Sequence, residues 1–414
     1  MLDIFDLTFF SRAWQDLPDL LIVAWPLWLI GFIFLLGVLT WEVRKYYARR
    51  TFLNKQKNCL IEIKLPKEML KSPLAMELFL MSLFLPGGEA TWYDKYWLGK
   101  CRAPFSLEIV SLDGVVHFYI WMREAARNYV ESALYAQFPG VEIFPADDYA
   151  QKVFFEKSGL IIFGTEFKLT KEDAYPIKTY VDYGLDKDPK DEFKVDPLTP
   201  LIEFFGSLKK GEQMWLQIVV RAYPFKDSPW KEEADKVINE IMGRDPKTRL
   251  PKETPESKLT GLPRAPQLSK EEQEVVVAIQ RSLSKLAFEV GIRSLYIAEK
   301  DKFTGFNITG LLGLMKQFSS NTLNGFKLSN VTGFDFPWQD YKNWRVNKKK
   351  RAILAYYKLR SFFYPPYHND KRTFVLNTEE LATLFHFPGV VSQTPTFTRI
   401  ASRKAEAPAN LPVE

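Results

Sequence analysis

The chain has 414 residues, of which 46% are hydrophobic and 15% are aromatic, and its formal net charge is +6. This composition excludes a disordered chain and leaves room for two ordinary domains with cores of their own. The modest net charge also excludes a uniformly basic surface, so contact with nucleic acid would require a local patch.

Cysteine and histidine are scarce. Two free, buried thiols would be typical of a protein in a reducing compartment, and a single disulfide between them is the alternative. The histidines are too scattered for a metal site, and we expect neither a metal nor another cofactor. These residues are Cys59, Cys101, His117, His368 and His386.

Residues 20–39 are twenty consecutive positions without a charged side chain. A helix of this length spans the ~30 Å hydrocarbon core of a bilayer. A cleaved signal peptide is the alternative, but the apolar run is long, acidic residues precede it and no small-residue cleavage motif follows it. We therefore predict a transmembrane helix over residues 20–41, preceded by a short extracytoplasmic N-terminus of residues 1–19.

The charges on either side of this run differ in sign. Four aspartates and one arginine precede it, whereas residues 42–57 form a basic juxtamembrane segment. The positive-inside rule then places the N-terminus outside and the large C-terminal part in the cytoplasm of a single-pass protein of the cell membrane. We expect four of the bases to lie at the membrane interface, in contact with the lipid bilayer. They are Arg44, Lys45, Arg49 and Arg50.

Residues 58–150 carry the pattern strand, helix, strand, strand, helix, strand. The alternation of apolar residues predicts strands at 58–65, 105–111, 115–122 and 141–144, and helices at 74–85 and 123–137. Ser72-Pro73 is typical of a helix start, and Asp113-Gly114 of a hairpin turn. The predicted fold class is α+β, with one N-terminal transmembrane helix followed by a ferredoxin-like βαββαβ domain.

Residues 151–330 form a second predicted α/β domain. Strands are expected at 160–169, 213–223 and 292–298, and helices at 199–208 and 307–319. A capping box of Ser269 and Glu272 predicts a further helix that runs to Val290, with Gly291 at its C′ position. One strand is missing from a second βαββαβ unit, so duplication of the ferredoxin-like fold is one arrangement among others.

Two further segments complete the predicted organisation. Residues 224–268, which contain a short charged helix at 230–242 and then a proline-rich stretch, are expected to form a mobile insertion. Residues 331–391 are a C-terminal helical region with a helix at 347–363, a strand at 374–376 and a helix capped by Asn377 and Glu380. Residues 392–414 are rich in Thr, Pro and Ala and are typical of a linker.

Motifs for catalysis are missing from the sequence. It contains no GxxxxGK[ST] phosphate loop and no GxGxxG, HExxH or GxSxG motif, so we expect no enzyme activity. The acidic pairs Asp147-Asp148 and Glu379-Glu380 lie beside turns or caps, which favours a structural role.

One dense basic run lies away from the membrane segment and consists of Lys348, Lys349, Lys350 and Arg351. Such a run is typical of a contact with a polyanion, either nucleic acid or lipid. The alternative is a solvated helix start, although four bases there oppose the helix dipole.

The run FVLNTEELATLFHFPG (374–389), followed by ASRKAEAPANLP (401–412), resembles a known segment. In membrane-associated, conjugation-type DNA-translocase ATPases, relatives of the type IV secretion ATPases, it joins the N-terminal region to the motor domain. The membrane segment and the α/β region before it are similar as well. Because this sequence lacks the nucleotide-binding motifs of that family, the resemblance assigns no catalytic residue to it.

The resemblance implies a membrane-anchored, non-catalytic module that tethers or assembles a translocation ATPase, as a separate subunit or as part of a longer chain. The implied partners are the lipid bilayer and a P-loop ATPase domain or subunit, with DNA and a second copy of the chain as further candidates. Two alternatives stay open: a stand-alone membrane scaffold that recruits a cytoplasmic protein, and a membrane-bound enzyme whose site the sequence does not reveal.

Overall fold

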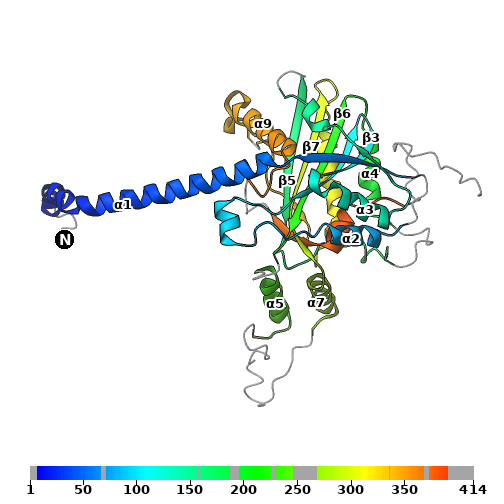
Figure 1. The fold of residues 1–414 in the computed structure, drawn as a ribbon, viewed down its shortest axis with the longest axis horizontal. Helices are drawn as coiled ribbons and strands as arrows, with labels where there is room; N and C mark the ends of the chain where they lie inside the picture. The colour runs from blue at the N-terminus through cyan, green and yellow to red at the C-terminus, as the bar shows by residue number, and fades with distance from the viewer. Residues whose placement is uncertain are drawn as a thin grey trace, which may run out of the picture. The chain divides into compact units, whose positions relative to one another are not determined.

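A computed structural model gives the fold of the chain (Figure 1). It describes residues 7–66, 71–155, 159–186, 195–224, 229–245, 268–334, 336–367 and 373–389, without the side chains of residues 7–25, 27, 337 and 341. The predicted tail of residues 392–414 and much of the predicted mobile insertion lie outside these ranges. The chain divides into two compact units, one of Met1–Lys55 and Glu89–Cys101 and the other of Gln56–Gly88 and Arg102–Glu414.

The first unit is built on helix α1 (Leu7–Lys55), which comprises 49 residues. Figure 1 shows most of it as one long helix. A short π-helical segment, η1 (Tyr93–Trp97), packs beside its C-terminal part. The predicted span of residues 20–41 begins where side chains are not described. Among the described residues, no helix combines the length and the apolar character needed to cross a membrane.

The second unit is a nine-stranded sheet with helices on both faces. Its strands are β1 (Asn58–Lys64), β2 (Phe105–Leu112), β3 (Val115–Arg123), β4 (Glu142–Pro145), β5 (Leu160–Leu169), β6 (Glu212–Ala222), β7 (Ala287–Glu299), β8 (Phe326–Leu328) and β9 (Phe374–Asn377). Its principal helices are α2 (Pro73–Ser82), α3 (Arg127–Gln137), α4 (Thr199–Gly206), α5 (Pro229–Ile241), α7 (Lys270–Leu283), α8 (Gly305–Leu314), α9 (Trp344–Lys358) and α10 (Thr378–Leu384).

The strand order is β4-β1-β3-β2-β6-β7-β5-β8, and all the neighbours pair antiparallel. Each half of the chain follows the order strand, helix, strand, strand, helix, strand, and each half-sheet has its fourth strand at the outer edge. The strand that the sequence did not reveal in the second half is β8. At three residues it is too short to give a recognisable alternation.

The two α/β domains predicted from the sequence share this one sheet. Strand β2 is the inner edge of the first half and β6 that of the second, and they pair along their length from Phe105↔Val220 to Leu112↔Gln213. Unpaired backbone groups at a sheet edge invite association with other chains. The β2–β6 pairing therefore protects an edge of each half. Strand β9, from the predicted C-terminal helical region, joins the same sheet by pairing with the start of β7.

Several local predictions are confirmed. Ser72 caps α2, with Pro73 as its first residue, and Asp113 and Gly114 have the positive φ angles of 55° and 85° that a two-residue hairpin needs. Capping boxes are present at the starts of α7 and α10. The short helix expected near residue 230 is α5.

The predicted helix from Ser269 to Val290 is wrong at its C-terminal end. Helix α7 stops at Leu283, and residues 287–290 begin strand β7, where they pair with β6 and β9. Gly291 lies within the strand, and a side chain there would collide with the ring of Phe362. Apolar residues that alternate near the end of a helical pattern fit either structure, and the pairing with distant strands decides between them.

The two faces of the sheet have different cores. Helices α2, α3, α4, α8 and α10 cover one face and bury apolar side chains such as Phe79, Leu134 and Phe205. Helix α9 covers part of the other face through Ile353, Leu354 and Tyr357.

A row of buried polar residues also lies on the second face, on four adjacent strands in register. Gln217 donates to Glu108 at 3.0 Å, and Arg293 donates to Gln217 at 3.2 Å and to Glu166 at 2.8 Å. Each of these residues is therefore hydrogen-bonded to its neighbour on the next strand.

Candidate polyanion-binding site

The basic run predicted to contact a polyanion lies in the first turns of α9. This helix begins at Trp344, three residues before the predicted start, and ends at Lys358. The carboxylate of Asp340 accepts hydrogen bonds of 2.7 Å from the backbone N–H groups of Arg345 and Val346. A carboxylate at a helix N-terminus interacts favourably with the dipole, which offsets part of the cost of placing four bases there.

The four bases of the run do not share one surface. Lys348 and Arg351, one turn apart, line a surface hollow of about 490 Å³ together with Lys342, Trp344 and Asn347. In contrast, Lys349 donates to the carbonyl of Val331 at 3.3 Å and lies 4.2 Å from the ring centre of Phe334. Burial lowers the pKa of Lys350. The structure therefore separates Lys348 and Arg351 from the other two.

Exposed aromatic rings accompany these bases. Trp344 is 67% exposed, and the ammonium of Lys348 lies 5.5 Å from its ring centre. Nearby in the sequence, Trp338 is 79% exposed and stacks on Phe336 with ring centres 4.7 Å apart. Bases beside exposed aromatic rings can pair with phosphates while the rings stack on nucleobases, which is how many proteins hold single strands. This combination could also lie at a lipid headgroup.

The four predicted interface bases lie on α1, in the first unit. The guanidinium of Arg44 lies 3.6 Å from the ring centre of Trp97, and the ammonium of Lys45 lies 5.7 Å from that of Tyr96. Arg50 donates to the hydroxyl of Tyr46 at 3.2 Å, and Arg49 is half-buried. The aromatic partners from η1 were missed in the sequence, although the run TWYDKYW at 91–97 carried the signal.

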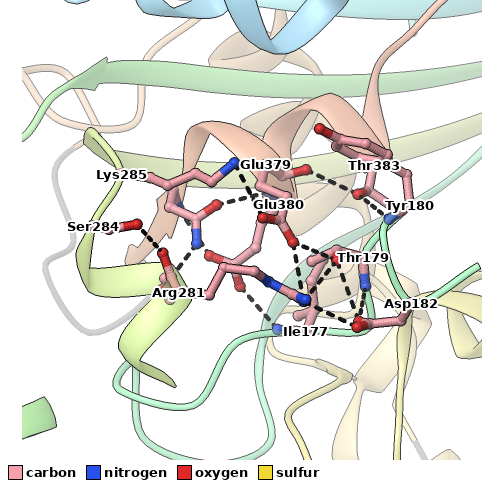
Figure 2. Close-up of polar contacts among 12 residues, drawn as sticks. Ile177, Thr179, Tyr180, Asp182, Arg281, Ser284, Lys285, Glu379, Glu380 and Thr383 are labelled. Atoms are coloured by element: carbon pink, nitrogen blue, oxygen red, sulfur yellow. Dashed lines mark hydrogen bonds and ion pairs between the residues drawn. The ribbon is translucent and has the colours of Figure 1, made fainter. Parts of the chain in front are cut away.

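The second acidic pair, Glu379-Glu380, lies in a buried cluster of polar contacts at the start of α10 (Figure 2). Glu379 accepts a hydrogen bond of 2.6 Å from Thr179 and forms ion pairs of 3.2 Å with Arg281 and with Lys285. Arg281 also pairs with Asp182 at 2.9 Å. The cluster ties α10 to α7 and to residues 177–182, which supports the structural interpretation of this acidic pair.

Glu380 is fully buried and accepts hydrogen bonds of 2.8 Å from the backbone N–H groups of Ile177 and Asn377. Burial raises the pKa of Glu380 to about 8, although the two N–H donors oppose this shift. The side chain therefore binds a proton over a pH range in which an exposed glutamate would be ionised.

The first acidic pair and the two cysteines lie outside this cluster. Asp148 pairs with Arg360, and Asp147 is exposed next to it. Cys59 and Cys101 are both free thiols in the structure. Over the residues that the structure describes, no group of three or more His, Cys, Asp or Glu side chains is arranged to hold a metal ion.

The comparisons with known proteins concern nearly all of the second unit. The sequence model of one family, described as Domain of unknown function (DUF8128), matches residues 57–399. The chain belongs to this family. The matched range begins just after α1 and includes the whole sheet, α9 and α10. No curated protein matches the chain.

Proposed function

We propose that the protein is a single-pass membrane anchor whose cytoplasmic α+β domain tethers or assembles a translocation ATPase of the conjugation or type IV secretion kind. One observation carries the anchoring step. The uncharged run of residues 20–39 lies within one helix, and its described side chains from Trp28 to Leu39 include ten large apolar groups exposed by 46% or more. Such a surface is unfavourable in water and favourable in lipid.

The part that tethers the ATPase rests on the resemblance of residues 374–389 to the joining segment of these ATPases. This segment forms β9 and α10, whose side chains are almost all buried against β7, α2 and the cluster of Figure 2. We infer that it fixes the point at which the chain leaves the domain toward the motor. We also infer that the two halves of the sheet are duplicated ferredoxin-like units.

The anchoring step is tested by extraction of membranes with alkaline carbonate. We expect the full chain to stay in the pellet and a variant that lacks Leu20–Leu39 to be released. Topology is tested with Lys300→Cys, which places a thiol in an exposed turn after β7. In intact cells an impermeant maleimide should leave this thiol unlabelled, and labelling would reverse the proposed orientation.

The tethering step is tested by recovery of the partner from membranes. A tagged full chain, purified in detergent from its native cells, should retain a protein or domain that carries a P-loop. Its ATPase activity should depend on that P-loop and on no residue of the present chain. If the pure chain hydrolyses ATP, and a point change within it abolishes turnover, the non-catalytic assignment is wrong.

A second candidate function is the binding of single-stranded DNA by the α9 surface. It is favoured by the exposed Trp344 next to Lys348 and Arg351. It is compatible with the first proposal, since a translocation ATPase of this kind would bring DNA to the domain. The salt dependence of binding tests it, as set out in the Discussion.

A further inference from the structure

Residues 89–101 leave the sheet domain between α2 and β2 and belong to the same compact unit as α1. Within that unit they place aromatic rings on one stretch of the helix. Trp92 stacks on Trp41 with ring centres 6.0 Å apart, and Trp97 covers the guanidinium of Arg44. Tyr96 lies near both Trp41 and Lys45. We call the set of Trp41, Arg44, Lys45, Trp92, Tyr93, Tyr96 and Trp97 the interface collar.

The segment that carries the collar is held in shape by its own contacts. Thr91 donates to Asp94 at 2.7 Å, and Lys100 forms an ion pair of 2.8 Å with the same carboxylate. The backbone N–H of Lys100 also donates to the carbonyl of Asp94 at 2.9 Å. These contacts leave the carboxylate paired, so its charge is compensated next to the bases of α1.

A glycine allows the segment to approach the helix. Gly99 has a φ of +65°, and a side chain at this position would collide with the backbone of Ala48 and Arg49 on α1. Positive φ and a close backbone approach are both conditions that favour glycine. The docking of residues 89–101 on α1 is therefore a built feature of this unit, which a single larger residue would disrupt.

The collar is exposed where a membrane surface would lie. Trp92 is 61% exposed, Tyr93 is 52% exposed and Trp97 is 45% exposed. Arg44 comes five residues after Leu39, the last residue of the apolar run, which corresponds to about 7.5 Å along a helix axis. The polar headgroup region extends ~5–8 Å beyond each side of the hydrocarbon core. The bases and rings of the collar would thus be level with the headgroups.

We propose that the interface collar binds the headgroup layer of an anionic bilayer and fixes the depth of α1 in it. Amphipathic rings of Trp and Tyr prefer this layer, and arginine and lysine next to them pair with lipid phosphates. The charges on the collar and next to it agree with an anionic surface. Arg44, Lys45 and Lys95 supply positive charge there, and the two carboxylates beside them are paired, Glu42 with Lys45 and Asp94 with Lys100. This inference rests on the proposed membrane anchor.

The experiment uses the full chain in vesicles that contain anionic lipid and one of two photoreactive lipids. One carries a diazirine next to the headgroup and the other at the end of the acyl chain. After irradiation, mass spectrometry locates the lipid adducts. We expect the headgroup probe to modify residues 89–101 and 41–47, and the acyl-end probe to modify residues 20–39. Replacing anionic by zwitterionic lipid should lower the headgroup adducts severalfold, because the bases of the collar are attracted to an anionic surface.

Two variants separate the collar from the anchor. Gly99→Val should abolish the headgroup adducts in residues 89–101 while the acyl-end adducts in residues 20–39 persist. Trp92→Ala combined with Trp97→Ala should lower the headgroup adducts in residues 41–47. In contrast, Trp338→Ala, which removes a still more exposed ring from the other unit, should leave them unchanged.

The outcomes distinguish the two proposals. Adducts in residues 20–39 without any in residues 89–101 would overturn the collar and leave the anchor. Adducts in residues 89–101 alone would support the collar as a lipid-binding surface and overturn the span. If neither segment reacts, both proposals fail.

Discussion

The two faces of the sheet bury different kinds of side chain. Under α2, α3, α4, α8 and α10 the buried side chains are almost all apolar, and they fill space without a need for particular partners. Under α9 and residues 360–367 the sheet instead buries Glu108, Gln217, Arg293 and Glu166 in one cross-strand row. The stability of the first face depends on how closely its side chains fill the available volume. The stability of the second face depends on whether each buried charge keeps its partner.

The second face is completed by an arginine from outside the sheet. Arg360 donates to Glu108 at 3.0 Å and to Asp148 at 2.6 Å, and it has a φ of 48° at the end of α9. Glycine is usual at such a position, so the backbone accepts a cost that the two ion pairs offset. The buried charges of the second face therefore restrict the backbone conformation of the segment that covers it more strictly than apolar packing would.

The comparison of the two faces predicts the largest loss of stability for a substitution in the charged row. Arg293 is fully buried and pairs with the equally buried Glu166. Arg293→Met should lower the free energy of unfolding by about 4 kcal/mol, because it leaves a buried carboxylate without its guanidinium. Urea unfolding of the detergent-solubilised chain measures this loss.

The matched control for Arg293→Met is Arg127→Met. Arg127 pairs with Glu131 on the surface of α3, and exposed pairs of this kind contribute less than ~1 kcal/mol. Adding Glu166→Gln to Arg293→Met should recover part of the loss. Equal effects of the two single variants would refute the idea that this face depends on charge pairing.

A smaller loss is expected on the apolar face. Leu134 is fully buried on α3, and Leu134→Ala should cost about 3 kcal/mol through lost burial and the cavity left behind. Tyr135→Ala on the exposed side of the same helix should cost no more than ~0.5 kcal/mol. Similar values for the two in urea unfolding would mean that α3 does not seal the core.

The apolar face also contains buried charged groups, among them those of the cluster of Figure 2, and one of these makes stability depend on pH. Glu380 has a pKa of about 8 in the folded chain and an ordinary value of 4.5 when unfolded. Between these values the folded chain holds a proton that the unfolded chain has lost. This contribution to stability is therefore full below about pH 4.5 and decreases as the pH rises to about 8.

Glu380→Gln tests this pH dependence, because glutamine can keep the capping box of α10 without ionising. The fall in melting temperature between pH 5 and 8 should be smaller in the variant than in the natural chain. Glu272→Gln is the control, since Glu272 has the same position in the capping box of α7 but is exposed. If Glu380→Gln leaves the pH profile unchanged, Glu380 is ionised in the folded chain.

Local signals account for what the sequence predicted correctly. The cap of α2, the Asp113-Gly114 turn and the capping boxes at Ser269 and Asn377 depend on neighbouring residues, and all four are present. The β2–β6 pairing joins strands that are more than a hundred residues apart, and no local pattern encodes it. Likewise, Arg293 and Arg360 look like surface bases until their distant carboxylates are known.

For the candidate polyanion-binding site too, the sequence revealed the local signal and not the contacts between distant residues. The sequence located the basic run at residues 348–351, because charge density is visible in one dimension. It did not show that Lys349 contacts Val331 and that Lys350 is half-buried, since these contacts come from the packing of α9 on the second face. Of the four bases in the run, Lys348 and Arg351 line the hollow beside Trp344, together with Lys342.

Because Lys348 and Arg351 line the hollow and the other two bases do not, substitution of this pair tests the DNA-binding proposal directly. The same substitution has the smallest predicted effect on stability. Lys348→Gln with Arg351→Gln should leave the free energy of unfolding within ~0.5 kcal/mol, because both side chains are exposed. If the surface binds single-stranded DNA, the slope of log affinity against log salt should become shallower by about 1.4, or ~0.7 for each lost phosphate contact.

The control is Lys349→Gln with Lys350→Gln, which removes the same charge from outside the hollow and should change the slope much less. Fluorescence anisotropy with a labelled oligonucleotide at several salt concentrations measures both slopes. Equal slopes for the two double variants would show that net charge alone attracts the DNA and that the hollow beside Trp344 is not a binding site.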